Sequence, residues 1–483
     1  MYNAYITRIK NLHKHPGADR LQIGECFGNA VIVSMEYEDN QLGVYFPSDG
    51  QLSVEFAEAN NLLRKKDADG NNIGGYMDPD KRNVTAIKLR GEKSDGLFLP
   101  LKSLESFGDI TTLNEGDRID TFNGHEICCK YIPKSNKRIK ENCSWCKTRK
   151  KSAPIAPLFA EHADTEQLAY NLSAFKPGDE IEITLKMHGT SQRTGYLPVL
   201  KGYKKTLLDR ILRREGKPVY DWGYVSGTRR TVLEDFDGGY YGSNEFREAH
   251  SKFFEGKLNK GEEIFYEVVG FTHTGAPIMS SCNNKKLNDK EFVKQYGEET
   301  VFSYGCSPYG YVRNMTIDDD DECFDCTPIS HSPQSDIYVY RMTMTNEDGF
   351  TIEYTPDYMR YRCEQMGVKC VPVMWKGFIP EVLNYVALTE RGEETGELVP
   401  IEVNPGEWVK EKAEQYYDGP DPIGKNHIRE GVVVRIINRP KFAAYKHKNW
   451  FFKALEGIVK VEAEAPDMEE AQDSCEEDNN ALS

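Results

Sequence analysis

The chain has 483 residues, of which 39% are hydrophobic and 29% charged, a composition typical of a globular protein with two or three domains. No signal segment opens it and no stretch is apolar enough to span a bilayer, so we expect an intracellular, cytoplasmic protein, or one in the nucleoid or host cytoplasm if it is viral. The net charge of -16 argues against a uniformly basic protein, but the charge is segregated into an acidic end and a basic middle stretch.

Short apolar stretches separated by turn residues, at roughly ten-residue spacing, occupy residues 1–125 and predict a small antiparallel barrel. Residues 6–10, 15–21 and 90–97 resemble an OB-type RNA-binding module. The resemblance implies a nucleic-acid-binding domain with basic residues that contact RNA, and the candidates are Arg8, Lys10, Lys88 and Arg90. A solvated barrel face, or a face that packs on the next domain, is the alternative.

The composition of residues 126–160 predicts a basic linker. By count, nine bases and one acid fall between residues 130 and 151, followed by a proline-rich run. Such a run either lies along a phosphate backbone or is a solvated loop. The pairs Cys143/Cys146 and Cys323/Cys326 have the Cys-x-x-Cys spacing of zinc sites, but a lone pair specifies little, so zinc binding is left open.

A strand followed by a turn is predicted around Lys186. Ile181, Ile183 and Leu185 alternate with polar residues, and Gly189 ends the strand. A strand-end lysine beside a glycine is a candidate covalent nucleophile, because glycine lets a phosphate or ribose approach closely. The motif is short, and an exposed lysine before a turn is the alternative.

Five further motifs follow in order. They are a Ser-Gly-x-Arg turn ending at Arg229, an apolar strand with Glu267 at its centre, an aromatic strand over 336–343, a Glu-Gly-Val-Val strand beginning at Glu430, and a Lys-x-Lys strand with Lys446 and Lys448. A carboxylate within a buried strand needs a partner, which marks Glu267 as a candidate site residue.

The order of these motifs over residues 182–453 resembles the covalent nucleotidyltransferases, the superfamily of RNA ligases, DNA ligases and mRNA capping enzymes. DNA ligases and capping enzymes carry a further OB domain after the Lys-x-Lys strand, and only 35 residues follow Lys448 here. The chain therefore resembles the RNA-ligase branch with an N-terminal OB domain. We expect an α+β fold, with an adenylyltransferase domain of antiparallel sheets flanked by helices over 161–460 and a disordered acidic tail over 461–483.

The resemblance implies an ATP-dependent RNA ligase in which Lys186 carries AMP and Lys446 and Lys448 assist catalysis. The expected nucleotide-binding residues are His188, Gly189, Arg229, Glu267, Tyr340 and Glu430. Glu267 and Glu430 are also the expected ligands of magnesium or manganese. Tyr340 is expected to stack on adenine, with Tyr338 as the alternative, and His188 stands where many relatives have aspartate.

The expected partner is RNA, as a nicked duplex or an RNA/DNA hybrid, and the expected state is a monomer. Two other functions stay open. One is an RNA-binding protein with an inactive transferase domain, and the other is a guanylyltransferase.

Overall fold

The chain divides into two compact units in the computed structural model. The structure describes residues 2–66, 72–132, 153–159, 161–162, 165–207, 209, 216–233, 236, 241, 243–310, 316–317, 323–325, 332–390 and 393–462. The first unit combines Met1–Asn136 with Cys282–Glu299 and Asn449–Asp467, and the second combines Lys137–Ser281, Thr300–Lys448 and Met468–Ser483. Most of the predicted linker and nearly all of the predicted acidic tail lie outside the described residues.

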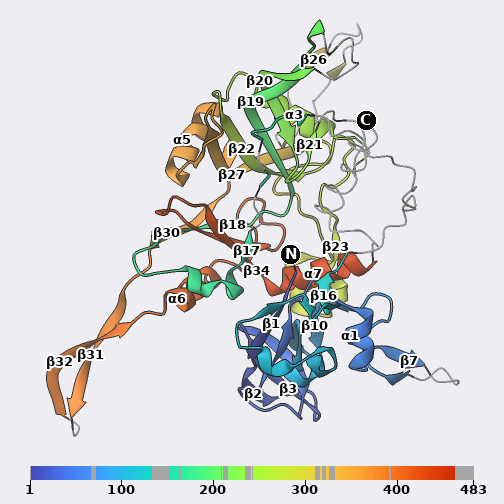
Figure 1. The fold of residues 1–483 in the computed structure, drawn as a ribbon, viewed down its shortest axis with the longest axis vertical. Helices are drawn as coiled ribbons and strands as arrows, with labels where there is room; N and C mark the ends of the chain where they lie inside the picture. The colour runs from blue at the N-terminus through green and yellow to red at the C-terminus, as the bar shows by residue number, and fades with distance from the viewer. Residues whose placement is uncertain are drawn as a thin grey trace. The chain divides into compact units, whose positions relative to one another are not determined.

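Both units consist mainly of antiparallel strands with few helices (Figure 1), which confirms the expected mixture of helices and antiparallel sheets. No helix in the described ranges is long and apolar enough to cross a membrane.

The first unit contains several small sheets around one apolar core. A four-stranded sheet has the order β12 (Leu97–Pro100), β5 (Leu42–Phe46), β1 (Ala4–Arg8), β13 (Arg118–Ile119), and a three-stranded sheet has the order β2 (Lys10–Lys14), β3 (Leu21–Cys26), β4 (Asn29–Ser34). A third sheet joins β16 (Cys128–Lys130), β6 (Gly50–Leu52) and β9 (Asn83–Val84), and β10 (Ala86–Leu89) pairs with β11 (Glu92–Asp95). Ile6, Val44 and Phe46 pack in the core with Phe56 of α1 (Val54–Ala59). Since the described strands form separate sheets, no closed barrel is present among them, and the expected OB-type barrel is not confirmed.

Two segments from far along the sequence complete the first unit. They contribute α4 (Lys290–Tyr296) and α7 (Trp450–Glu462). Both ends of the β10–β11 hairpin are ion-paired to them, because Lys88 Nζ lies 2.7 Å from Asp289 and Lys453 Nζ lies 2.6 Å from Asp95. The first unit is therefore built from three parts of the chain, of which Cys282–Glu299 lies within the range expected for the transferase domain and Asn449–Asp467 overlaps its end.

The second unit contains two larger sheets, both visible in Figure 1. A five-stranded sheet has the order β17 (Glu166–Gln167), β34 (Ala443–Lys448), β33 (Gly431–Ile436), β18 (Glu180–Leu185), β30 (Val373–Phe378). A seven-stranded sheet has the order β21 (Val232–Leu233), β20 (Lys217–Gly227), β19 (Thr190–Lys204), β22 (Glu262–Gly270), β27 (Ser335–Thr345), β28 (Thr351–Glu353), with β29 (Lys369–Cys370) also paired to β27. Helices α3 (Glu245–Phe253), α5 (Pro356–Met366) and α6 (Pro405–Glu414) and the hairpin of β31 (Val382–Glu390) and β32 (Glu393–Glu402) complete the unit. The four residues 186–189 connect β18 of the first sheet to β19 of the second.

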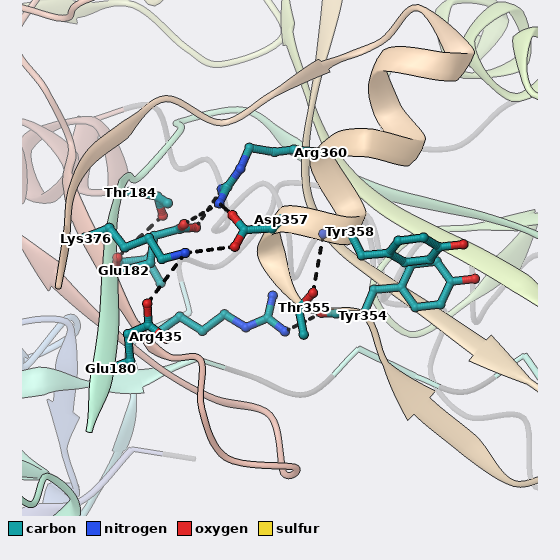
Figure 2. Close-up of polar contacts among 11 residues, drawn as sticks. Glu180, Glu182, Thr184, Tyr354, Thr355, Asp357, Tyr358, Arg360, Lys376 and Arg435 are labelled. Atoms are coloured by element: carbon teal, nitrogen blue, oxygen red, sulfur yellow. Dashed lines mark hydrogen bonds and ion pairs between the residues drawn. The ribbon is translucent and has the colours of Figure 1, made fainter. Parts of the chain in front are cut away.

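Both faces of β18 are buried, which its alternating sequence does not reveal. Ile181 and Ile183 pack in the apolar core as predicted. On the opposite face, Glu182 is only 3% exposed and accepts two hydrogen bonds from Arg360 of α5, at 3.1 and 2.8 Å (Figure 2). Arg360 also contacts Asp357, at 2.6 Å. An ion pair therefore covers Glu182 and supports the strand that leads to Lys186.

Candidate active site

Lys186 follows the last residue of β18 and faces a buried carboxylate. Its backbone N–H donates to the carbonyl of Gly431 at 3.0 Å, which extends the pairing of β18 with β33. Its Nζ lies 2.7 Å from Oε1 of Glu430, a side chain that is 1% exposed. The sequence predicted both residues, and strand pairing brings them together across 244 positions because Leu185 pairs with Val432.

A second lysine shares the same carboxylate oxygen. Lys448 Nζ lies 3.2 Å from Glu430 Oε1, because Lys448 is the cross-strand partner of Gly431. This pairing requires glycine at position 431, where φ is +148° and a Cβ would lie 2.1 Å from the carbonyl oxygen of His447. Lys446 lies two residues earlier on β34 and pairs with Val433. Two ammonium groups therefore converge on one buried carboxylate.

His188 is held from its backbone and from its ring. Its N–H donates to the hydroxyl of Tyr304 at 2.7 Å, and its ring centroid lies 4.5 Å from that of Phe302. Its Nδ1 is 3.8 Å from Oε2 of Glu430. Burial, together with nearby carboxylates that include Glu430 and Glu267, raises the pKa of Tyr304 well above its ordinary value, so this hydroxyl stays protonated.

No sequence pattern marks Tyr304. It lies in a loop after β24 (Glu299–Thr300), in no predicted strand and in no motif of the resemblance. Its φ of +48° is uncommon for a residue other than glycine, and its contact with His188 spans 116 positions. Only the folded chain brings the two together.

Gly189 and Glu267 lie in contact. A Cβ at position 189 would lie 2.4 Å from the carbonyl oxygen of Val268 and 2.9 Å from Cγ of Glu267. Ser191, Glu267 and Tyr338 are direct cross-strand partners on β19, β22 and β27, so their side chains lie on one face of the sheet. Glu267, predicted to bind nucleotide or metal, is thus placed beside the turn that follows Lys186.

The aromatic strand contains a β-bulge at Tyr340. Phe265 pairs with Arg341 and Tyr266 pairs with Val339, which leaves Tyr340 as the extra residue. Its hydroxyl lies 3.0 Å from Oγ of Ser191, so the ring is anchored to the start of β19. Tyr338 is 5% exposed, whereas Tyr340 is half-buried. The expectation that Tyr340 stacks on adenine stays a prediction.

Arg229 lies in the turn that follows β20. Its carbonyl accepts the N–H of His162 at 3.1 Å, and the turn is closed by a 2.9 Å bond from the N–H of Thr228 to the carbonyl of Thr231. His162 lies beside Tyr340, with ring centroids 5.3 Å apart. The nucleotide-binding role of Arg229 stays a prediction.

The four predicted RNA-contacting residues lie in the first unit. Arg8 pairs with Glu115 at 3.0 Å, and Lys88 pairs with Asp289. Arg90 donates to the carbonyl of Gly17 at 3.2 Å, and Lys10 is exposed at the start of β2. Two of these cations are therefore ion-paired within the unit, and the role of all four in RNA binding stays a prediction.

The cysteine pairs lie largely outside the described residues, which exclude Cys143, Cys146, Cys326 and the side chain of Cys323. Among the side chains that the structure describes, no group of three or more His, Cys, Asp and Glu residues is placed to hold a metal ion by itself.

Solved structures of Naegleria gruberi RNA ligase resemble the chain along nearly its whole length. The structure with pyrophosphate has a TM-score of 0.50 at 16% identity and covers 96% of this chain and 99% of that chain. A lysine-to-alanine mutant with ATP and manganese has a TM-score of 0.50 at 15% identity, and another in the apo form has 0.50 at 16%, each over the same shares. No family model and no curated protein matches the sequence. The chain therefore has the fold of these RNA ligase structures.

Proposed function

We propose that the chain is an ATP-dependent RNA ligase that works through a covalent lysyl-adenylate at Lys186. The observation that carries the proposal is the convergence of Lys186 and Lys448 on the buried carboxylate of Glu430 at the connection between two sheets. The structures with the same fold include one RNA ligase with ATP and manganese and one with pyrophosphate. ATP and pyrophosphate are the substrate and the leaving group of lysine adenylylation.

Three group transfers make up the reaction. The neutral amine of Lys186 attacks the α-phosphorus of ATP, so that an N–P bond forms, the α–β P–O bond breaks and pyrophosphate leaves. An RNA 5′-phosphate oxygen then attacks the same phosphorus and takes AMP from the lysine. Finally the neighbouring RNA 3′-OH attacks the 5′-phosphorus and displaces AMP, which seals the strand.

The contact between Lys186 and Glu430 must open before the first step. An ammonium that donates to a carboxylate at 2.7 Å has no lone pair with which to attack phosphorus. Lys448 lies on the same carboxylate oxygen and remains as a counterion when Lys186 leaves. Lys446 and Lys448 would then meet the negative charge of the phosphates and of the departing pyrophosphate.

Magnesium or manganese fits the two acidic residues. Glu430 and Glu267 supply hard carboxylate oxygens. Glu267 packs against the backbone of Gly189, which has no side chain to block the approach. Glu430 is the first candidate ligand, while Glu267 would bind metal or, alternatively, the ribose. When bound, the ion would neutralise phosphate charge and disfavour an ammonium at Lys186.

The remaining assignments follow the resemblance. Tyr340 would stack on adenine, Arg229 would contact the ribose or the 5′-phosphate, and His188 and Gly189 would line the nucleotide site. The first unit, in which residues 6–10, 15–21 and 90–97 resemble an OB-type module in sequence, would hold RNA, either as a nicked duplex or as an RNA/DNA hybrid, and the enzyme would act as a monomer.

Incubation with α-labelled ATP and magnesium tests the proposal. We expect a labelled band that survives denaturing electrophoresis, is absent in Lys186→Ala and persists in Lys176→Ala, a control that removes an exposed lysine of the same unit. A band with labelled GTP but not with ATP would support a guanylyltransferase instead. RNA binding without any band would support an inactive transferase domain.

A second assay defines the substrate. Joining of nicked duplexes, with the 3′-OH strand and the 5′-phosphate strand switched separately between RNA and DNA, should require RNA on the 3′-OH side. Efficient joining with DNA on both sides would contradict the assignment to RNA.

A further inference from the structure

Four side chains form a closed cluster beside the catalytic turn. The ring of His188 packs edge-on against Phe302, with centroids 4.5 Å apart, and Phe302 packs against His427 at 5.3 Å. The ring centroid of His427 lies 4.6 Å from that of Tyr304, and the Tyr304 hydroxyl accepts the His188 N–H at 2.7 Å. Phe302 and Tyr304 are each 3% exposed and His427 is fully buried. This cluster of His188, Phe302, Tyr304 and His427 joins three separate segments, and we refer to it as the His188 cluster.

The segment that carries His427 is a loop stabilised by its own hydrogen bonds. The carboxylate of Asp421 accepts the N–H groups of Ile423 and Gly424 at 3.1 and 2.5 Å, and the Asp421 N–H donates to the carbonyl of His427 at 2.8 Å. The loop leads within three residues of His427 to Glu430, the partner of Lys186. A loop closed in this way gives the cluster a fixed support.

The loop that carries Tyr304 is tied to this support. Asn426 donates from Nδ2 to Oγ of Ser303 at 2.7 Å. Tyr304 keeps a φ of +48°, and for a residue other than glycine such a conformation persists only when its surroundings impose it. The hydroxyl of Tyr304 is therefore placed by the loop at 419–428 and by ring packing, and not by its own backbone preference.

These contacts connect the two sides of the active site. His188 follows Lys186 by two residues, and His427 precedes Glu430 by three. The backbone at position 188 is fixed by a hydroxyl whose ring packs on the segment leading to Glu430. The distance from Lys186 to the carboxylate thus depends on the cluster as well as on strand pairing.

We propose that Tyr304 is a positioning residue for lysine adenylylation, which acts through its hydrogen bond to the His188 N–H to hold the turn 186–189 in the conformation from which Lys186 attacks. This inference rests on the proposed function. Tyr304 acts on the turn and makes no chemical change itself. Its effect belongs to the steps in which Lys186 is the nucleophile or the carrier of AMP.

The test separates adenylylation from sealing in Tyr304→Phe. The variant removes one oxygen and keeps the ring contact with His427. We expect the single-turnover rate of lysyl-AMP formation at saturating ATP to fall about 10- to 100-fold, as for a displaced nucleophile. The KM for ATP should change less than about threefold, and the sealing of a nick that already carries AMP on its 5′-phosphate should stay within about threefold of wild type, because that step does not use the lysine as nucleophile.

A matched control removes another buried tyrosine hydroxyl from the same unit. Tyr354 is 7% exposed and donates to Glu262 at 3.1 Å, and Tyr354→Phe should leave lysyl-AMP formation within about twofold of wild type. Asn426→Ala, at an exposed residue, offers a second variant that keeps the fold. It should slow lysyl-AMP formation several-fold and leave sealing unchanged.

Two results would overturn the inference. One is lysyl-AMP formation at the wild-type rate in Tyr304→Phe. The other is an equal loss of adenylylation and of sealing of the pre-adenylylated nick, which would mark a general structural defect. Failure of the proposed function is a different outcome, because the wild-type protein would then form no lysyl-AMP at all.

Discussion

Gly189 offers a direct test of the geometry around Lys186. The substitution Gly189→Ala places a methyl group 2.4 Å from the carbonyl oxygen of Val268, whereas ordinary contacts begin at 3.4 Å. The turn or strand β22 must therefore move by about 1 Å, since the obstacle is backbone that has no rotamer to change. Overpacking of this kind costs about 1–3 kcal/mol of stability. With Lys186 as the proposed nucleophile, a displacement of about 1 Å slows its reaction by about 100-fold.

The assay measures both quantities in the same variant. Urea unfolding gives the change in stability, and the single-turnover rate of lysyl-AMP formation gives the effect on Lys186. Gly223→Ala is the matched control, because its Cβ would meet Cγ2 of Val199 at 2.5 Å, a similar clash in the same sheet but outside the turn 186–189. We expect a similar loss of stability, about 1–3 kcal/mol, but normal adenylylation in the control. Wild-type adenylylation in Gly189→Ala would refute the close approach of the turn to β22.

Three further predictions concern stability. Arg360→Ala leaves the carboxylate of Glu182 buried without this partner and should lower the free energy of unfolding in urea by about 2–3 kcal/mol. Adding Glu182→Gln should recover part of that loss. A loss below about 0.5 kcal/mol would show that the pair contributes little. Burial lowers the pKa of His250 to about 4, so the unfolded chain binds a proton that the folded chain excludes, and stability falls as the pH drops from 6.5 towards 4. His250 should lower the free energy of unfolding at pH 5 by at most about 2 kcal/mol relative to pH 8. His250→Gln should flatten the dependence of stability on pH, whereas an unchanged dependence would assign it to other groups. Gly457→Ala, inside α7, places its Cβ in ordinary contact with Thr85 at 3.6 Å and should raise stability by about 0.5–1 kcal/mol, and destabilisation would contradict the helical environment.

Local patterns in the sequence determined the strands and the order of the motifs. Alternation predicted the core row of β18, and Ile181 and Ile183 indeed pack in the core, because a strand places every second side chain on one face. The motif order led to a resemblance to RNA ligases, and the structural comparisons show the fold of RNA ligase structures. It also named Lys186, Lys448 and Glu430, which the fold brings together.

Only the tertiary structure decided what each charged group contacts. Lys88 and Arg8 were predicted to form part of a basic RNA-binding face. Both are ion-paired within the first unit, Lys88 to Asp289, 201 positions away. The hydroxyl of Tyr304 reaches the turn after Lys186 from a loop with no motif. Such contacts join segments that are distant in sequence, and their geometry depends on strand pairing and loop conformation. Residue type and spacing determine periodicity along the chain, whereas the partner of a side chain is determined by how the whole chain packs.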